Sequence, residues 1–142
     1  MRIELILHPD HVSVLLSNPS SYEKKIWEFE NSWGWYSIAF HLKVESEGRT
    51  RTITRSSREW TRNGPSFFVI PPGQVREIEF DINDGWWDKN KNIGQLKNLP
   101  VMVRACLKVT PSPEAEKYGA FVGTALSEWV VSSPPHGWLF EN

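Results

Sequence analysis

Tryptophan is the residue type in this sequence best suited to contact a ligand. The 142-residue chain contains 8 tryptophans, and most of them stand beside glycine, asparagine or charged residues rather than inside apolar runs. An indole offers a large apolar surface and a single N–H donor, so it either covers the end of a hydrophobic core or forms part of a contact surface.

Two aromatic-rich segments flank apolar stretches. Residues 31–36 precede one alternating segment, and residues 83–88 follow another. Loops gather at the two ends of a β-sandwich, so these segments can meet at one end. Their indoles would then form a rigid apolar patch edged by Asp and Asn. Such a patch is typical of a protein-binding hot spot, and it would also suit a platform on which a sugar ring stacks.

Five arginines fall between residues 49 and 62, and three of them are expected on one strand face next to Trp60. Guanidinium groups pair with carboxylates or phosphates and stack on aromatic rings, which favours an acidic ligand. The alternative is a charged edge strand that discourages association between sheets. The predicted partner-binding residues are Trp33, Trp35, Trp60, Trp86, Trp87, Arg49, Arg51 and Arg55.

Catalytic motifs are missing from the sequence. It contains no Gly-x-Ser-x-Gly elbow, phosphate-binding glycine loop or His-Glu-x-x-His helix. Asp84 and Asp88 flank two tryptophans and would suit a hydrolase with paired carboxylates, but Asp84 with its following glycine equally forms a turn. Cys106 lies in an apolar segment and is expected to pack as a small hydrophobic residue. We therefore expect no enzyme, with a hydrolase using Asp84 and Asp88 as the catalytic alternative.

A metal site is not expected either. His8, Asp10 and His11 offer two imidazoles and a carboxylate, whereas a structural zinc site needs four ligands. A polar turn between two strands is the better interpretation of this segment. We expect no metal and no cofactor.

Composition favours a single globular domain spanning residues 1–142. The hydrophobic content is 39%, and the net charge of −1 does not favour nucleic-acid or membrane binding. The first apolar run is too short and too charged for a secretory signal or a membrane span. A single cysteine favours a reducing cytoplasmic setting, with a periplasmic or secreted protein as the alternative if a leader has been removed.

The elements that must position these residues show a period of two. Apolar and polar residues alternate over residues 36–44, 12–17, 77–82 and 101–109, the pattern of strands with one solvated face. Weaker strands are expected over residues 3–7, 25–29, 50–55, 67–70 and 121–131. Only residues 113–118, closed by Gly119, read as a helical turn. The predicted fold is an all-β, immunoglobulin-like antiparallel sandwich of about seven to nine strands.

The order of these elements resembles a bacterial immunoglobulin-like or fibronectin-like sandwich. The resemblance rests on the strand and turn at residues 14–20, the turn at residues 70–74, and the two segments 103–107 and 121–128. Intracellular proteinase inhibitors of the bacilli are similar in outline. The resemblance implies an architecture and supplies no catalytic residues, because this scaffold carries many unrelated sites.

The sequence therefore predicts a non-catalytic protein-binding domain that presents tryptophan-rich loops to a partner. An inhibitor or immunity protein that blocks an enzyme or toxin is the most specific form of this prediction. A carbohydrate-binding module is the second candidate, because the same indoles could stack on glycans.

Overall fold

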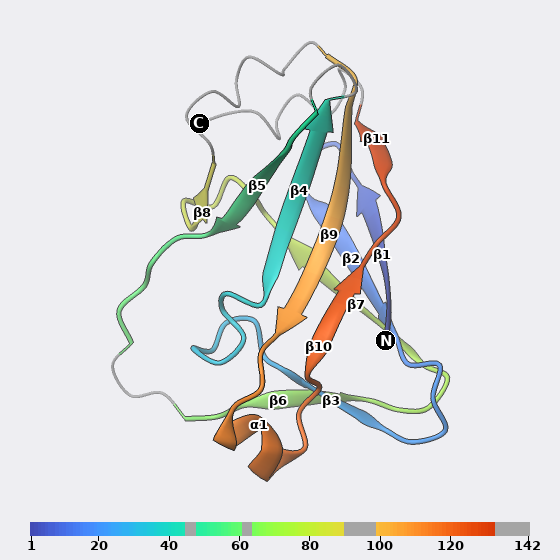
Figure 1. Ribbon diagram of the computed structural model, residues 1–142, viewed down its shortest axis with the longest axis vertical. Helices are drawn as coiled ribbons and strands as arrows, with labels where there is room; N and C mark the ends of the chain where they lie inside the picture. Colours follow the sequence, from blue (N-terminus) through green and yellow to red (C-terminus); the bar gives the residue numbers. More distant parts are fainter. Residues whose placement is uncertain (45–47, 61–63, 90–98, 133–142) are drawn as a thin grey trace.

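The computed structural model describes residues 1–44, 48–60, 64–89 and 99–132. Within them the chain is almost entirely β, with antiparallel strand pairs and one short helix (Figure 1). The elements in chain order are β1 (Arg2–Leu7), β2 (Val12–Ser17), β3 (Lys24–Trp27), β4 (Ile38–Val44), β5 (Thr50–Arg55), β6 (Phe67–Ile70), β7 (Val75–Phe80), β8 (Trp87–Asp88), β9 (Val101–Val109), α1 (Pro113–Tyr118), β10 (Gly123–Leu126) and β11 (Val130–Ser132). The predicted all-β sandwich is confirmed.

Two sheets form the layers of the sandwich. One has the order β1-β2-β7, and the other has the order β10-β9-β4-β5-β8 with β11 also paired to β9. Strands β3 and β6 form a separate ribbon near α1 (Figure 1).

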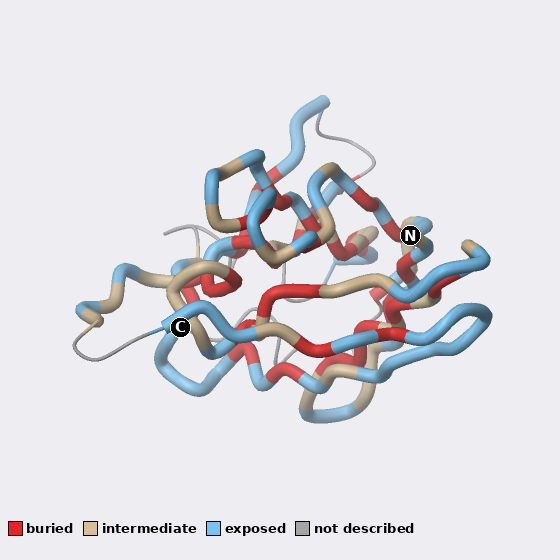
Figure 2. Tube along the Cα trace, turned by 90° about the horizontal axis from the view of Figure 1, so that it is seen from below, coloured by how far each residue is buried: buried red, intermediate tan, exposed pale blue. Residues whose placement is uncertain are grey.

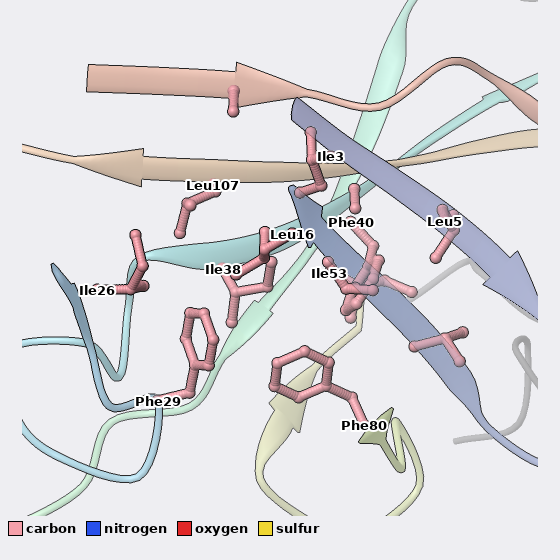
Figure 3. Close-up of a cluster of buried hydrophobic side chains, with 14 of the residues drawn as sticks. Ile3, Leu5, Leu16, Ile26, Phe29, Ile38, Phe40, Ile53, Phe80 and Leu107 are labelled. Atoms are coloured by element: carbon pink, nitrogen blue, oxygen red, sulfur yellow. The ribbon is translucent and has the colours of Figure 1, made fainter. Parts of the chain in front are cut away.

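Alternation along the strands builds the core between the layers. Strands β4 and β9 bury every second residue, and their inward side chains meet those of β1 and β2 (Figure 3). Buried segments lie between the layers, and the exposed ones form the turns and outer faces (Figure 2). The period of two in the sequence therefore reports directly which side chains face the opposite sheet.

A bulge divides the last strand into β10 and β11. Leu126 pairs with Cys106, but Val130 pairs with Val103, so one extra residue lies on this edge of the sheet. At the interruption the Ser127 hydroxyl accepts the backbone N–H of Ala105 at 2.8 Å. The bulge reverses the inward and outward positions after residue 127, as an inserted residue must. A single uninterrupted strand over residues 121–131, as the alternation suggested, is therefore wrong.

Asn18 ties the end of β2 to two other segments. Its buried amide donates to the carbonyls of Tyr22 at 2.8 Å and Ile70 at 2.9 Å, and its side-chain oxygen accepts the N–H of Ser20 at 3.0 Å. The Asn18 side chain thus supplies hydrogen-bond partners to backbone groups at the point where the chain leaves the sheet.

Replacing this residue tests its role as a clamp. Asn18→Ala leaves a buried carbonyl without its partner, so we expect the free energy of unfolding to fall by about 1–3 kcal/mol. Urea unfolding followed by far-UV circular dichroism measures the change. Ser21→Ala, at an exposed position of the same turn, should leave the midpoint unchanged; equal midpoints for both variants would contradict the role given to Asn18.

Candidate functional site

Three loops bring their tryptophans together where β4 begins and β5 ends. The ring of Trp35 lies 5.6 Å from that of Trp60 and 5.6 Å from that of Trp86, edge to face in both pairs. Such pairs prefer this geometry because the positive ring edge meets the negative ring face. The loops at residues 31–36 and 83–88 therefore do share one end, and the segment after β5 joins them.

Arg58 lies among these three rings. Its guanidinium carbon is 4.9 Å from the ring centre of Trp35, 4.6 Å from that of Trp60 and 5.1 Å from that of Trp86. All three distances fall within the range of cation–π attraction. A cation thus holds indoles from three separate segments in fixed positions.

Arg55 forms a second, deeper layer of the same stack. Its guanidinium carbon lies 4.0 Å from the ring centre of Trp35 and 4.5 Å from that of Trp87, and its side chain is only 2% exposed. Glu30 joins the two layers, with one carboxylate oxygen 3.3 Å from Arg55 and the other 3.8 Å from Arg58. We call Trp35, Trp60, Trp86, Trp87, Arg55, Arg58 and Glu30 the indole–arginine cluster.

Burial and neighbouring charge act in opposite directions on Arg55. Burial lowers the pKa of its guanidinium, because a charge loses solvation in the interior, while the carboxylates of Glu30 and Asp84 raise it. Aromatic faces and the exposed carboxylates of Glu30 and Asp84 are therefore the features that stabilise this cation inside the protein.

Backbone hydrogen bonds fix the three loops to one another. The indole N–H of Trp35 donates to the carbonyl of Ser56 at 2.8 Å, and the N–H of Ser56 donates to the carbonyl of Trp86 at 2.8 Å. The carboxylate of Asp84 accepts the N–H of Trp86 at 2.8 Å. The exposed part of the cluster consequently stands on a rigid base.

The five predicted indoles differ in exposure. Trp35 is fully buried and Trp87 is 8% exposed, so both serve as base for the cluster. Trp60 is half-buried and Trp86 is 41% exposed. Contact with another molecule is therefore available mainly at these last two, together with the half-buried Arg58.

Two of the three arginines that were predicted to share a strand face and bind a partner are buried on β5. Arg51, Ile53 and Arg55 do share a face, but this face points inward, and Arg51 and Arg55 are 7% and 5% exposed. Arg49 lies before the strand and is exposed. The alternation predicted correctly that Arg51, Ile53 and Arg55 lie on one face of the strand. It could not show that this face packs against the core, because arginine is rarely buried without partners.

Trp33 does not join the cluster. Its ring lies 6.2 Å from that of Trp27, which in turn lies 6.2 Å edge to face from Tyr118 on α1. Trp33 and Trp35, which lie in the same loop, thus pack in two separate groups of aromatic rings. Trp33 borders two surface pockets, of about 450 Å³ and about 310 Å³.

Gly34 allows one loop to direct Trp33 and Trp35 into two separate groups of aromatic rings. A Cβ at this position would stand 2.2 Å from the carbonyl oxygen of Glu28. Only glycine allows the chain to pass so close to its own preceding turn. The loop is closed further by the N–H of Trp35, which donates to the carbonyl of Asn31 at 2.8 Å. Residues 36 and 37 consequently belong to this loop, and β4 begins at Ile38, not at Tyr36 as the alternation predicted.

The remaining candidates have structural roles in the described chain. The ring of His8 stacks on that of His11 at 4.2 Å, and His11 lies 2.7 Å from the carboxylate of Asp10, within the β1–β2 turn. Asp84 and Asp88 are exposed, and neither lines the two pockets beside Trp33. Cys106 is half-buried on β9, where burial raises the pKa of its thiol.

Sequence reasoning missed Glu30, Tyr36 and Tyr118, and it gave no separate role to Arg58. The only available signal for Arg58 was its position two residues before Trp60. Glu30 pairs with residues 25 and 28 positions away, a separation at which spacing carries no information.

Comparisons with protein-family models, curated proteins and solved structures find no match to this chain. Within the described ranges, no helix has the length and apolar character needed to cross a membrane. The candidate site is therefore inferred from its geometry alone.

Removal of the deeper guanidinium tests the base of the cluster. Arg55→Ala leaves a cavity between buried rings, so we expect the free energy of unfolding to fall by about 2–5 kcal/mol. Arg58→Ala, at a half-exposed position, should cost about 1 kcal/mol or less. Chemical unfolding followed by indole fluorescence measures both; the reverse order of effects would contradict the layered arrangement.

A methyl group at residue 34 tests the loop that separates the two aromatic groups. Gly34→Ala places its Cβ against backbone, so we expect a loss of about 1–3 kcal/mol and a changed near-UV circular dichroism spectrum. Gly48→Ala is the matched control, because a Cβ there meets nothing within 4 Å. If Gly34→Ala proves as neutral as the control, the close approach is not a constraint.

Proposed function

We propose that this protein is a non-catalytic binding domain that docks a protein partner on the exposed face of the indole–arginine cluster. The observation that carries the proposal is a pair of accessible indoles, Trp60 and Trp86, held by Arg58 on a buried base. Tryptophan and arginine are the residue types most enriched at the energetic centres of protein interfaces.

The charge around the cluster supports a basic partner. Residues 30–36, 55–60 and 81–89 carry five carboxylates, all exposed, on Glu30, Glu59, Asp81, Asp84 and Asp88. The three cations of these segments are buried or half-buried. Of the five carboxylates, Glu30 pairs with Arg55 and Arg58, and Asp84 accepts the N–H of Trp86, so both lie beside the aromatic faces and favour arginine or lysine side chains of a partner.

Preorganisation of the cluster supports tight association. Binding is weakened by the entropy of ordering flexible side chains and loops, and this cost is smaller when the contact surface is already fixed. The hydrogen bonds among Trp35, Ser56 and Trp86 hold the three loops before any partner arrives.

An inhibitor or immunity protein acting on a basic enzyme or toxin is the most specific form of this proposal. A small sandwich with a rigid loop patch suits the blocking of another protein's site, and the single cysteine favours a reducing, cytoplasmic setting. The hydrolase alternative has less support, because Asp84 accepts a backbone N–H within its own turn. In the carbohydrate alternative, the exposed indoles of this same face would stack on a glycan instead of contacting a protein partner.

Affinity capture with matched variants tests the proposal. Wild-type protein, Trp86→Ala, Trp60→Ala and Tyr22→Ala are immobilised and exposed to a native lysate at low salt, and captured proteins are quantified by mass spectrometry. We expect a basic partner that Tyr22→Ala, an exposed control, retains and that both tryptophan variants lose. With the purified partner, each tryptophan variant should weaken binding about tenfold or more.

Charge is tested separately with the purified partner. Asp84→Asn and Glu59→Gln should slow association, and raised salt should weaken binding of the wild type, because exposed charges act mainly on the encounter rate. A captured set that is the same for wild type and both tryptophan variants would overturn the proposed docking face.

A further inference from the structure

The geometry points to a second ligand site, in the two pockets that Trp33 lines, which takes a saccharide carrying a carboxylate. This site is distinct from the indole–arginine cluster, because its lining shares no side chain with that cluster. It does not depend on the proposed protein partner.

The larger pocket has the size and the lining of a small-molecule site. Its volume of about 450 Å³ lies within the usual range for ligand pockets, roughly 300–1,000 Å³. Segments from three parts of the chain form it, and they share aromatic rings, hydroxyl groups and one amine. The lining residues are Trp27, Ser32, Trp33, Tyr36, Ser37, Lys108, Val109, Thr110 and Ser112.

Aromatic rings supply flat apolar surface at this pocket. Trp33 is half-buried and Tyr36 is 56% exposed, so both present ring surface to the solvent. Trp27, 2% exposed, supports Trp33 from behind at a ring distance of 6.2 Å. The apolar C–H faces of a sugar ring match such a surface, and stacking on it requires no deep cavity.

Hydroxyl groups supply the complementary polar contacts. The hydroxyl of Ser37 is buried and donates to the carbonyl of Gly34 at 2.7 Å, so the more accessible lining hydroxyls are those of Ser32, Thr110 and Ser112. The hydroxyl of Ser112 accepts the N–H of Ala115 at 3.0 Å and keeps its own hydrogen for donation. Sugar hydroxyls, which both donate and accept, can pair with this mixed set.

Lys108 determines the charge of the expected ligand. It is exposed, and among the described residues that line this pocket it is the one charged side chain and none carries a carboxylate. The N–H of Lys108 donates to the carbonyl of Ser37 at 2.8 Å, so the strand end that carries the amine is fixed to the loop beneath the aromatic rings. An ammonium group without a facing carboxylate in the pocket favours an anionic ligand.

The second pocket extends the site across Trp33. It measures about 310 Å³ and is bordered by Trp33, Pro65, Pro113, Glu114, Lys117 and Tyr118. Because one indole borders both pockets, neighbouring units of an oligosaccharide can contact the same ring. The ligand class is therefore an oligosaccharide that includes uronic-acid units.

Titration with matched sugars tests this inference. The probes are tetragalacturonate and its methyl ester, which keeps the sugar and removes the charge. We expect indole fluorescence to change on addition of tetragalacturonate, and calorimetry to show binding about tenfold weaker for the ester, as expected for loss of one charge-assisted contact. A tetramer of mannuronate and its ester serve as a second pair.

Variants at exposed positions locate the site without disturbing the core. Lys108→Gln should weaken tetragalacturonate binding about tenfold and remove the preference over the ester, and Tyr36→Ala should weaken both sugars. Lys43→Gln, an exposed lysine on the same sheet, and Trp86→Ala, in the other aromatic group, are controls expected to bind as wild type.

Each contrary outcome overturns a defined part of the inference. Equal binding of acid and ester removes the role of Lys108, and absence of any response to both uronate pairs removes the saccharide site. Loss of sugar binding in Trp86→Ala would place the ligand on the indole–arginine cluster instead. Failure here leaves partner capture by Trp60 and Trp86 unaffected, so the two proposals are judged separately.

Discussion

A guanidinium buried against aromatic rings organises one end of this sandwich. Arg55 ends β5 on the inner face of its sheet, where its guanidinium carbon lies 4.0 Å from the ring centre of Trp35 and 4.5 Å from that of Trp87. A buried charge is costly unless its surroundings offset the lost hydration. Here the offset comes from ring faces and from Glu30, so the loops that supply these groups must assemble together.

This requirement connects the fold to the candidate binding surface. The loop at residues 31–36 supplies Trp35, the β7–β8 segment supplies Trp86 and Trp87, and the chain after β5 supplies Arg58 and Trp60. Each segment has little regular structure of its own, and the cation–π and backbone contacts fix their relative positions. The accessible indoles are consequently the outer layer of a packed unit, and their orientation depends on the buried layer below.

A single glycine divides the aromatic residues of one loop between two surfaces. Because Gly34 passes against the carbonyl of Glu28, Trp33 turns towards Trp27 and α1 while Trp35 turns towards β5. The two candidate sites therefore differ in chemistry although they share a loop. One presents indoles edged with carboxylates, and the other presents rings with hydroxyl groups and Lys108.

Alternating polarity along the chain determined most of the strands, because a strand with one buried face must repeat every two residues. It placed β2 and β9 at their observed bounds, the weaker candidate segments 50–55 and 67–70 match β5 and β6, and capping residues placed α1 over Pro113–Tyr118. The two-residue strand β8 has no period to detect, and the bulge at Ser127 is visible only through its pairing with Ala105. The local sequence pattern was sufficient to predict an element wherever that element depends on residues close to one another in the chain.

The sequence by itself therefore determined the fold class and most strand positions. It allowed the two tryptophan-rich loops to share one end, and the tertiary structure decided that they do. Only the tertiary structure decided which indoles are exposed, that Arg51 and Arg55 face the core, and that Trp33 belongs to a separate pair of pockets. The physical reason is that these outcomes depend on contacts between distant segments, such as Glu30 with Arg55 and Arg58. A buried arginine and an exposed one look the same in sequence, because the aromatic partners that make burial tolerable come from elsewhere in the chain.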